Sequence, residues 1–510
     1  MTVVGSKARS TRLGVDVLPA LNLVGALVKW LSLGFALPLA VALWDGETVW
    51  VWPVAGVATF AVFGSIELVT RGKEHVGARE GFLVVSLVWL FVAAVGALPY
   101  LLAGEDQLSR PLDAYFEAMS GFTTTGASVV LDFEDLPRSI LLWRQLTQWL
   151  GGIGIVVLAL AVLPRLRVGG RQILEHEMPG PEIESLRTRI GDTARRVSVL
   201  YLALSVLLVA ILAALGLTGV DERMSIYNSF AHAMSTMPTG GFGTEGTSLA
   251  AFAPASQWVI ALFMALAGAN FALLYQVFVR RAPREASRDH EFRLYVGLLA
   301  FASLVLLMVL ALDDSLEGSD APLRHAVFQT VSMMTTTGFA SVNFATWPAL
   351  AAMALIGLMF VGGSAGSTSG SVKVVRHLLM GKILRREIDQ TLHPELVAPI
   401  RLGRTIVDER TLRAVSSFVL LYIGIFVIGA VLLAADAART DSGMLVRDAI
   451  AASATTLGNV GPAFGFAGPY GSFEPFSDFS TIVMTGLMWL GRLEIVPIVV
   501  LLSRHYWRNR

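Results

Sequence analysis

The sequence predicts an all-α polytopic membrane protein, with two amino-terminal spans followed by four pseudo-repeats of helix, pore helix, filter loop and helix around one central pore. Composition is the first reason, because 54% of the 510 residues are hydrophobic and only 15% are charged, which is typical of membrane proteins. The second reason is a short glycine motif that occurs four times, each time between two long apolar runs. Such repetition indicates one structural unit used four times.

Ten apolar runs are long enough to cross about 30 Å of hydrocarbon, which takes about 20 helical residues. The predicted spans are 18–43 and 49–70, then 81–103 with 138–164, 197–217 with 256–279, 293–312 with 348–380, and 411–435 with 478–503. The predicted domains are an N-terminal two-span domain at 1–79, pore repeat one at 80–170, repeat two with a preceding cytoplasmic linker at 171–285, repeat three at 286–400 and repeat four at 401–510.

Each later pair of spans encloses a half-length helical stretch that ends at a glycine motif. These stretches lie at 113–122, 225–237, 322–334 and 446–457. They are too short to cross a membrane, so we predict that they are re-entrant. Arginine and lysine concentrate before the first span and at 71–79, 165–196, 280–293, 373–413 and 504–510. By the positive-inside rule, both termini are then cytoplasmic and the re-entrant loops enter from outside.

The four motifs align on a serine or threonine that lies six positions before a glycine. The hydroxyl residues are Ser120, Ser235, Ser332 and Thr455, and the glycines are Gly126, Gly241, Gly338 and Gly461. Irregular backbone at membrane depth must be buried in protein or line a water-filled cavity, and glycine permits the positive φ values that aim carbonyl oxygens at an ion. No charged residue lies within the motifs, which favours carbonyl coordination of an alkali cation over a divalent site. The alternative interpretation is that Gly and Thr serve only to pack helices together. Helix packing could account for a single motif, but it does not account well for four motifs in equivalent positions.

Two features lie close to these motifs in the predicted membrane region. The run 362–371 is rich in glycine and serine, so it has weak helix propensity and interrupts the span at 348–380. It is not interpreted as a phosphate-binding loop, because it does not end in the Gly-Lys-Ser/Thr sequence of such loops. Arg492 lies near the middle of the last span and therefore requires a polar cavity or a partner, such as an ion pair with another helix. Glu494, two positions on, faces away from it on a helix.

Other classes of function have less support. The neutral net charge does not favour a nucleic-acid partner, and the absence of cysteine excludes disulfides and thiolate metal sites. No Walker motif or nucleophile elbow is present, so neither an enzyme nor a resident cofactor is expected. A membrane-embedded enzyme would depend on Glu175 or His176 in the cytoplasmic segment 175–181, but this segment lacks His-x-x-x-His spacing and is interpreted as structural or partner-facing.

With these motifs the chain resembles the Trk/Ktr/HKT superfamily of potassium transporters, most closely its bacterial TrkH/TrkG branch, over essentially its whole length. The resemblance implies potassium uptake across the bacterial inner membrane, with K⁺ as the transported ion, by a lipid-embedded homodimer that has a cytosolic TrkA-type nucleotide-binding regulatory subunit. The implied K⁺-binding filter residues are Thr124, Thr125, Gly126, Thr239, Gly240, Gly241, Thr336, Thr337, Gly338, Asn459, Val460 and Gly461. The implied gate residues are Gly362, Gly363, Gly366, Ser367, Thr368, Ser369, Gly370, Lys373 and Arg492.

The second and fourth motifs depart from the family pattern. Pro238 and Gly240 replace threonines in the second motif, and Gly458-Asn459-Val460 precede the glycine of the fourth. Glycine in all four filter positions goes with preference for potassium over sodium in the family. Because two quarters depart from the pattern, a sodium-permeable or ion-coupled (Na⁺ or H⁺) symporter of the same fold remains the alternative function.

Overall fold

The computed structural model describes residues 15–72, 77–161, 183–312, 322–403 and 405–507. Within these ranges the chain is predominantly helical. The only strands there, β1 (Arg401–Leu402) and β2 (Thr405–Ile406), form a short antiparallel hairpin. The segment 175–181 and the predicted boundary between repeats one and two lie outside the described residues.

The N-terminal part is a pair of apolar helices. The first combines α1 (Val17–Val28), the 3₁₀ turn η1 (Lys29–Phe35) and α2 (Ala36–Asp45), and the second is α3 (Val51–Val69). The two helices approach closely at Gly25, where a Cβ atom would lie only 2.8 Å from a carbonyl oxygen of α3. Small residues allow this kind of close backbone contact between membrane helices.

The turn after α2 joins this pair to the helix α6 (Arg138–Ala161). The Glu47 carboxylate accepts hydrogen bonds from the N–H groups of Arg138 and Ser139, at 2.7 and 3.0 Å. Asp45 forms an ion pair with the Arg138 side chain at 3.0 Å. Acidic groups satisfy the free N–H groups at the start of a helix, so the turn fixes the N-terminal pair to the first pore unit.

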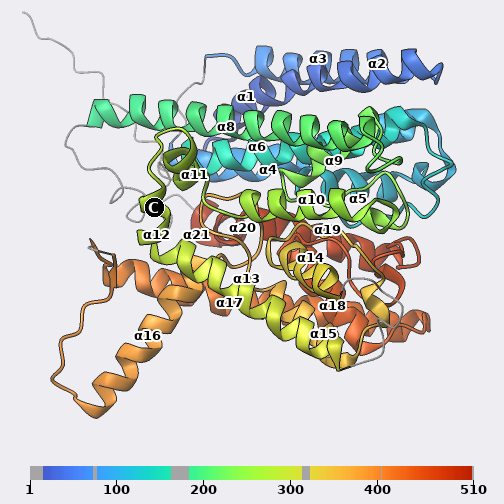
Figure 1. The fold of residues 1–510 in the computed structure, drawn as a ribbon. Coiled ribbons are helices and arrows are strands. Elements are labelled where there is room, and N and C mark those ends of the chain that lie inside the picture. Colours follow the sequence, from blue (N-terminus) through green and yellow to red (C-terminus); the bar gives the residue numbers. More distant parts are fainter. Residues whose placement is uncertain (1–14, 73–76, 162–182, 313–321, 404, 508–510) are drawn as a thin grey trace, which may run out of the picture.

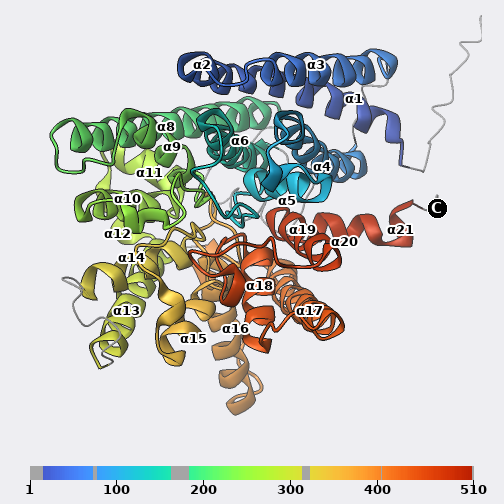
Figure 2. The ribbon, with the colours of Figure 1, turned by 90° about the vertical axis from the view of Figure 1, so that its right-hand side faces the viewer.

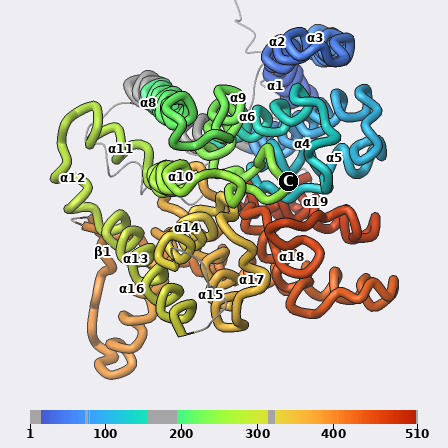
Figure 3. Tube along the Cα trace, turned by 45° about the vertical axis from the view of Figure 1, so that its right-hand side comes forward, coloured from blue at the N-terminus to red at the C-terminus, as the bar shows by residue number. Residues whose placement is uncertain are grey.

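The rest of the chain forms four units, each with an outer helix, a short helix that ends at a glycine motif, a loop and an inner helix. Unit one contains α4 (Ala78–Ala103), α5 (Pro111–Phe122) and α6; unit two contains α8 (Ile183–Leu217), α9 (Ile226–Thr236), α10 (Pro254–Ala267) and α11 (Phe271–Phe278); unit three contains α13 (His290–Ala311), α14 (Pro322–Met334), α15 (Ala349–Leu358) and α16 (Val374–Leu392); unit four contains α17 (Glu409–Thr440), α18 (Val446–Gly458), α19 (Asp478–Arg492) and α20 (Val496–Leu502). Figure 3 shows the units as four coloured sectors around a common centre, with α1–α3 outside it.

Smaller elements connect these helices. They are η2 (Asp106–Leu108), η3 (Ser248–Ala251), α12 (Pro283–Arg288), η5 (Phe344–Thr346), η6 (Gly465–Ala467) and α21 (Arg504–Trp507). The helix α16 extends away from the rest of the molecule, as Figure 1 and Figure 2 show from two sides.

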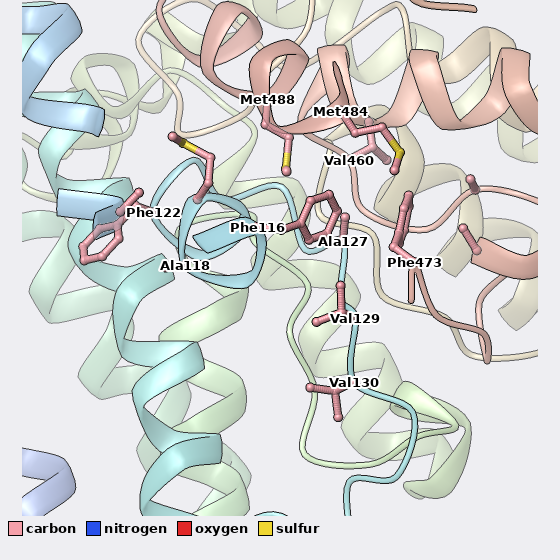
Figure 4. Packing of buried hydrophobic residues seen from close by; sticks show 14 of the residues in the cluster. Phe116, Ala118, Phe122, Ala127, Val129, Val130, Val460, Phe473, Met484 and Met488 are labelled. Atoms are coloured by element: carbon pink, nitrogen blue, oxygen red, sulfur yellow. The ribbon is translucent and has the colours of Figure 1, made fainter. Parts of the chain in front are cut away.

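The four half-length helices are confirmed. The helices α5, α9, α14 and α18 begin and end within two residues of the predicted stretches, and most of their residues are buried. Around them, Figure 4 shows the packing where units one and four meet: Phe116 lies beside Phe473, with ring centroids 5.7 Å apart, and Met484 of α19 lies close to Val460. The apolar core therefore surrounds the ends of the short helices.

Within the described ranges, six helices are long and apolar enough to cross a membrane, or up to eight if each of two bent pairs is one span. The ten predicted spans include α6 and the interrupted pair α15 and α16 as well. The interruption predicted at 362–371 is confirmed, because α15 ends at Leu358 and α16 begins at Val374.

Two predicted spans are not single continuous helices, as the prediction had them. The span at 256–279 bends by 109° between α10 and α11, and the span at 478–503 bends by 116° between α19 and α20. In the first, the Asn270 carboxamide oxygen accepts from the N–H groups of Ala272 and Leu273, at 2.8 and 3.1 Å, and so starts a new helix. In the second, Glu494 and Ile495 have φ angles of 56° and 61°, which a right-handed helix does not allow.

Candidate functional site

The four glycine motifs share one backbone conformation, in which the glycine and the residue two positions before it have positive φ. The φ angles are 53°, 55°, 58° and 53° at Thr124, Thr239, Thr336 and Asn459, and 84°, 82°, 82° and 113° at Gly126, Gly241, Gly338 and Gly461. The left-handed conformation costs a residue with a Cβ atom about 1–2 kcal/mol. The same strain at the same register in all four loops indicates that the surroundings impose it.

The residue between these two positions is hydrogen-bonded to the short helix before it. Its N–H donates to the carbonyl of the serine or threonine five positions earlier, at 2.8, 2.8, 2.8 and 2.9 Å in units one to four: Thr125 to Ser120, Gly240 to Ser235, Thr337 to Ser332, and Val460 to Thr455. The negative ends of the four helix dipoles therefore lie at the loops.

The four loops close into a ring, because each glycine lies against a carbonyl of the next unit. A Cβ atom added to Gly126, Gly241, Gly338 or Gly461 would lie 2.2, 2.0, 1.9 or 2.8 Å from the carbonyl oxygen of Gly240, Thr337, Val460 or Thr125, respectively. These distances leave no room for a side chain at any of the four positions. The contacts run from unit one to two, three, four and back to one.

In units two and four, where the motifs depart from the family pattern, side-chain hydrogen bonds hold the loops. In unit two, Gln148 of α6 donates to the Gly240 carbonyl at 2.7 Å and accepts from the Phe242 N–H at 3.1 Å. A Cβ atom on Gly240 would lie 2.4 Å from the Gln148 carboxamide, so a side chain there would displace Gln148 from these bonds. In unit four, the Asn459 side chain donates to the Thr125 hydroxyl at 2.9 Å and to the Met488 carbonyl at 3.0 Å.

In chemical terms the ring offers neutral oxygen atoms. Threonine hydroxyls are paired in units one and three, Thr123 with Thr125 at 2.7 Å and Thr335 with Thr337 at 2.8 Å. Among the described residues, no group of three or more His, Cys, Asp or Glu side chains is placed to hold a metal ion. Carbonyl and hydroxyl oxygens can replace the hydration shell of an alkali cation without a fixed charge.

The loop 362–371 contacts the helix side of this ring. The Gly370 N–H donates to the Thr336 hydroxyl at 2.7 Å. The Thr368 hydroxyl donates to the Met237 carbonyl at 3.1 Å and lies 3.4 Å from the Thr239 hydroxyl. The loop therefore touches the glycine motifs of units two and three directly.

The start of the same loop is held by the break between α10 and α11. The Ser364 N–H donates to the Gly268 carbonyl at 2.8 Å, and the Phe271 N–H donates to the Gly366 carbonyl at 3.3 Å. The Ala365 N–H donates to the Glu291 carboxylate at 2.6 Å. A Cβ atom on Gly363 would lie 2.5 Å from the Gly268 carbonyl oxygen, so this glycine permits the close approach.

The end of the loop is held by its own residues and by unit four. The Ser367 hydroxyl donates to the Ser364 carbonyl at 2.7 Å, and the Lys373 ammonium donates to the Ser369 carbonyl. Gly362 has a φ of 75° and lies next to Ser371, where the loop closes. The loop is thus compact, with its two ends close together.

Arg492 is 3% exposed and holds this loop from α19. Its guanidinium donates to the Thr368 carbonyl at 2.9 Å and to the Gly151 carbonyl of unit one at 3.5 Å. Its partners are therefore backbone carbonyls and not the ion pair with another helix that was the alternative. Glu494 instead forms an ion pair with Arg376 at 2.5 Å, so it does not pair with Arg492, as predicted. The predicted reason is wrong, because α19 ends at Arg492 and Glu494 lies beyond it with a φ of 56°.

All twelve predicted filter residues thus lie in the ring, and the predicted gate residues lie in or against the loop beneath it. Sequence reasoning missed Gln148, the pair Glu117 and Arg144, and the anchors Gly268 and Glu291. The polar residues had a visible signal, because Arg144 and Gln148 interrupt an otherwise apolar span, and such residues in a membrane segment usually serve a function.

Fold and site together define a helical membrane protein in which four half-length helices converge on one ring of backbone carbonyls. A sequence model of the TrkH family of cation transport proteins matches residues 53–508. The chain belongs to this family.

Similar proteins cover nearly the whole chain. The Trk system potassium uptake protein TrkH of Salmonella typhimurium is 37% identical over 442 residues, which are 86% of this chain and 88% of that protein. TrkH of Halomonas elongata is 34% identical over 494 residues (96% and 99%), and TrkG of Escherichia coli is 32% identical over 495 residues (96% and 98%). The crystal structure of the potassium transporter TrkH from Vibrio parahaemolyticus matches with a TM-score of 0.86 at 32% identity, over 97% of this chain and 100% of that one. The predicted family and fold class are confirmed.

Proposed function

We propose that this protein takes up potassium across the bacterial inner membrane through the ring formed by its four glycine motifs. The observation that carries the proposal is the closure of the ring, in which each filter glycine packs against a carbonyl of the next unit. The similar proteins are named for potassium uptake, which supports K⁺ as the transported ion. Backbone carbonyls of the twelve filter residues replace the water around K⁺ as it passes.

Selectivity arises from the rigidity of this ring. Each loop is bonded to its own short helix and lies against its neighbour, so its carbonyls cannot move inward without breaking these contacts. A smaller ion such as Na⁺ is then coordinated at longer distances than it prefers, and dehydration costs it more than it does K⁺. The loops of units two and four, whose sequences depart from the family pattern, are held by hydrogen bonds of Gln148 and Asn459. This supports potassium selectivity over the sodium-permeable or ion-coupled alternative.

The loop 362–371 acts as the gate in this proposal. It lies against Thr336 and Thr239 on the helix side of the filter, where a conducting ion leaves the ring. Arg492 holds it in place through Thr368 and adds a positive charge beside the ion path, which opposes the passage of cations. Release of these contacts opens the pore.

Around the pore we place the rest of the predicted assembly: N- and C-termini in the cytoplasm, two copies in the membrane, and a TrkA-type nucleotide-binding regulatory subunit on the cytosolic side. The names of the relatives, as parts of Trk systems, support a regulatory partner. The helix α16 follows the gate directly and extends away from the rest of the molecule, so it offers a route from such a partner to the loop.

The function is tested by measuring K⁺ and Na⁺ flux through the purified protein in liposomes, with and without the regulatory subunit. We expect K⁺ flux that exceeds Na⁺ flux under equal gradients. In parallel, the gene is expressed in cells that lack potassium uptake, and growth at low potassium is expected to return. Sodium entry without restored growth would show that the alternative function is correct.

Replacing Arg492 with glutamine is expected to raise K⁺ flux several-fold in the absence of the regulatory subunit. A hydrogen bond from a charged group contributes about 1.5–3 kcal/mol, and its loss frees the loop at Thr368. Flux is measured in liposomes at equal protein content. The matched control is Arg413→Gln on the exposed cytoplasmic end of α17, which is expected to behave as wild type. A purely structural role for Arg492 predicts a lower flux instead.

A further inference from the structure

A buried ion pair lies behind the filter of unit one, and the function proposed above does not use it. Glu117 of α5 and Arg144 of α6 are joined at 2.7 Å, and both side chains are 0% exposed. Removing two charges from water is unfavourable unless their geometry and remaining hydrogen bonds compensate. At the same distance before the filter glycine, the other units have His232, Gln329 and Ala452, so the pair is specific to unit one.

Ser128 connects this pair to the segment that follows the unit-one filter. Its hydroxyl donates to Glu117 at 3.0 Å and accepts from the Arg144 guanidinium at 2.9 Å and from the Val130 N–H at 3.0 Å. The second Glu117 oxygen accepts from the Val129 N–H at 3.0 Å. A serine hydroxyl has one donor and two acceptor sites, so every site of Ser128 is occupied.

The same group reaches the two neighbouring units. The Arg144 guanidinium lies 4.3 Å from the ring centroid of Phe242, the residue directly after the filter glycine of unit two. The Ser128 carbonyl accepts from the Phe473 N–H of unit four at 2.8 Å. Figure 4 shows Val129 and Phe473 on the two chain segments that meet here. The ion pair therefore fixes the segment 128–130, which follows the unit-one motif, and links this segment to units two and four.

We infer that Glu117 and Arg144 are positioning residues for ion selectivity, which hold the outer ends of three of the four filter loops at the spacing that suits K⁺. The inference rests on the potassium function proposed above. Because both side chains are fully buried, they act on the ion only through the loops. Without the pair, the segment 128–130 loses its bonds to α5 and α6, and the ring can contract around a smaller ion. The discrimination between K⁺ and Na⁺ then falls more than the K⁺ flux.

The test measures the ratio of K⁺ to Na⁺ flux through the full-length protein in liposomes. The first variant is Glu117→Gln, which keeps the shape of the side chain but removes its charge. The second is the double variant Glu117→Gln with Arg144→Gln, which leaves no unpaired buried charge. We expect the flux ratio to fall about tenfold in both, equivalent to ~1.4 kcal/mol, while K⁺ flux stays close to wild type.

The matched control is Arg138→Gln, because Arg138 begins the same helix but pairs with Asp45 and stacks on Tyr227 at the start of α9, outside the four motifs. Its flux ratio is expected to equal that of the wild type. A third variant, Arg144→Lys, keeps the charge but loses the planar guanidinium that stacks on Phe242. It also loses the geometry by which one nitrogen of this group donates to Glu117 and another to Ser128. It is expected to lose part of the selectivity, and it decides the question if the other two variants do not fold.

Three outcomes separate the possible explanations. A wild-type flux ratio in any folded variant of the pair overturns the inference. K⁺ and Na⁺ fluxes that fall in proportion also overturn it, because they indicate a role in stability alone. A wild-type protein that does not prefer K⁺ contradicts the proposed function itself, which is a different result from a loss of preference in the variants.

Discussion

Replacing Gly338 with serine is expected to lower the ratio of K⁺ to Na⁺ flux by at least about tenfold, because the new side chain strains the backbone by about 1–2 kcal/mol and also displaces a neighbouring loop. Gly338 has a φ of 82°, and a Cβ atom there would lie 1.9 Å from the Val460 carbonyl oxygen and 2.7 Å from the Pro462 side chain. The Val460 carbonyl is one of the proposed ligands, so its displacement changes the ring directly. The ratio is measured in liposomes.

The control separates backbone strain from crowding. Gly104 has a φ of 71° at the end of α4, but a Cβ atom there would meet nothing within 4 Å. Gly104→Ser therefore introduces the strain without the contact, and its flux ratio is expected to match the wild type. Unchanged selectivity in Gly338→Ser, or an equal loss in Gly104→Ser, would contradict a ring that is held by contacts between neighbouring loops.

The part of the fold that repeats along the chain was predictable. The four glycines follow a hydroxyl residue at a constant distance, and this local pattern sets both the end of each short helix and the register of each loop. The glycine and serine run at 362–371 was equally visible, because its composition cannot sustain a helix. In both cases the signal lies within a few consecutive residues.

The two bends at the inner helices were not predictable by the same reasoning. The segments 256–279 and 478–503 are mostly apolar, with only scattered polar residues such as Asn270, Arg492 and Glu494. A search for apolar length shows only whether such a stretch is long enough to cross a membrane, and not whether it bends. The bend after α10 depends on a single cap by Asn270 and on the loop of another unit, which bonds to Gly268. Contacts between units 100 residues apart in sequence leave no local pattern.

The residues of the ring were predictable from their motif, but the contacts that support the ring were not. Gln148 occupies the space that a threonine side chain would take at position 240, so the apparent irregularity of the second motif has its cause on α6. Likewise Asn459 bonds to Thr125 of unit one. A motif shows which backbone forms the ring, whereas the contacts that join it to other units, such as those of Gln148 and Asn459, are identified only in three dimensions.

Deleting residues 363–370 is expected to raise K⁺ flux by about tenfold or more in the absence of the regulatory subunit. The loop is held by several hydrogen bonds, each of which contributes about 0.5–1.5 kcal/mol, so the closed arrangement is favoured by enough to keep most molecules shut. The deletion is structurally feasible, because a Cβ atom on Gly362 would lie 3.2 Å from the Ser371 Cβ atom. The two ends can therefore be joined while α15 and α16 stay in place.

A milder variant tests the same mechanism without removing any residue. A Cβ atom on Gly370 would lie 2.3 Å from the Gly458 carbonyl oxygen, so Gly370→Ala pushes the loop away from the filter and is expected to raise the flux by a smaller factor. Gly381→Ala on α16 is the control, since a Cβ atom there meets nothing within 4 Å. Unchanged or lower flux in the deletion variant, in protein that folds and inserts normally, would show that the loop is a passive connection. A rise in both variants, larger in the deletion than in Gly370→Ala, would identify the loop as the closed gate.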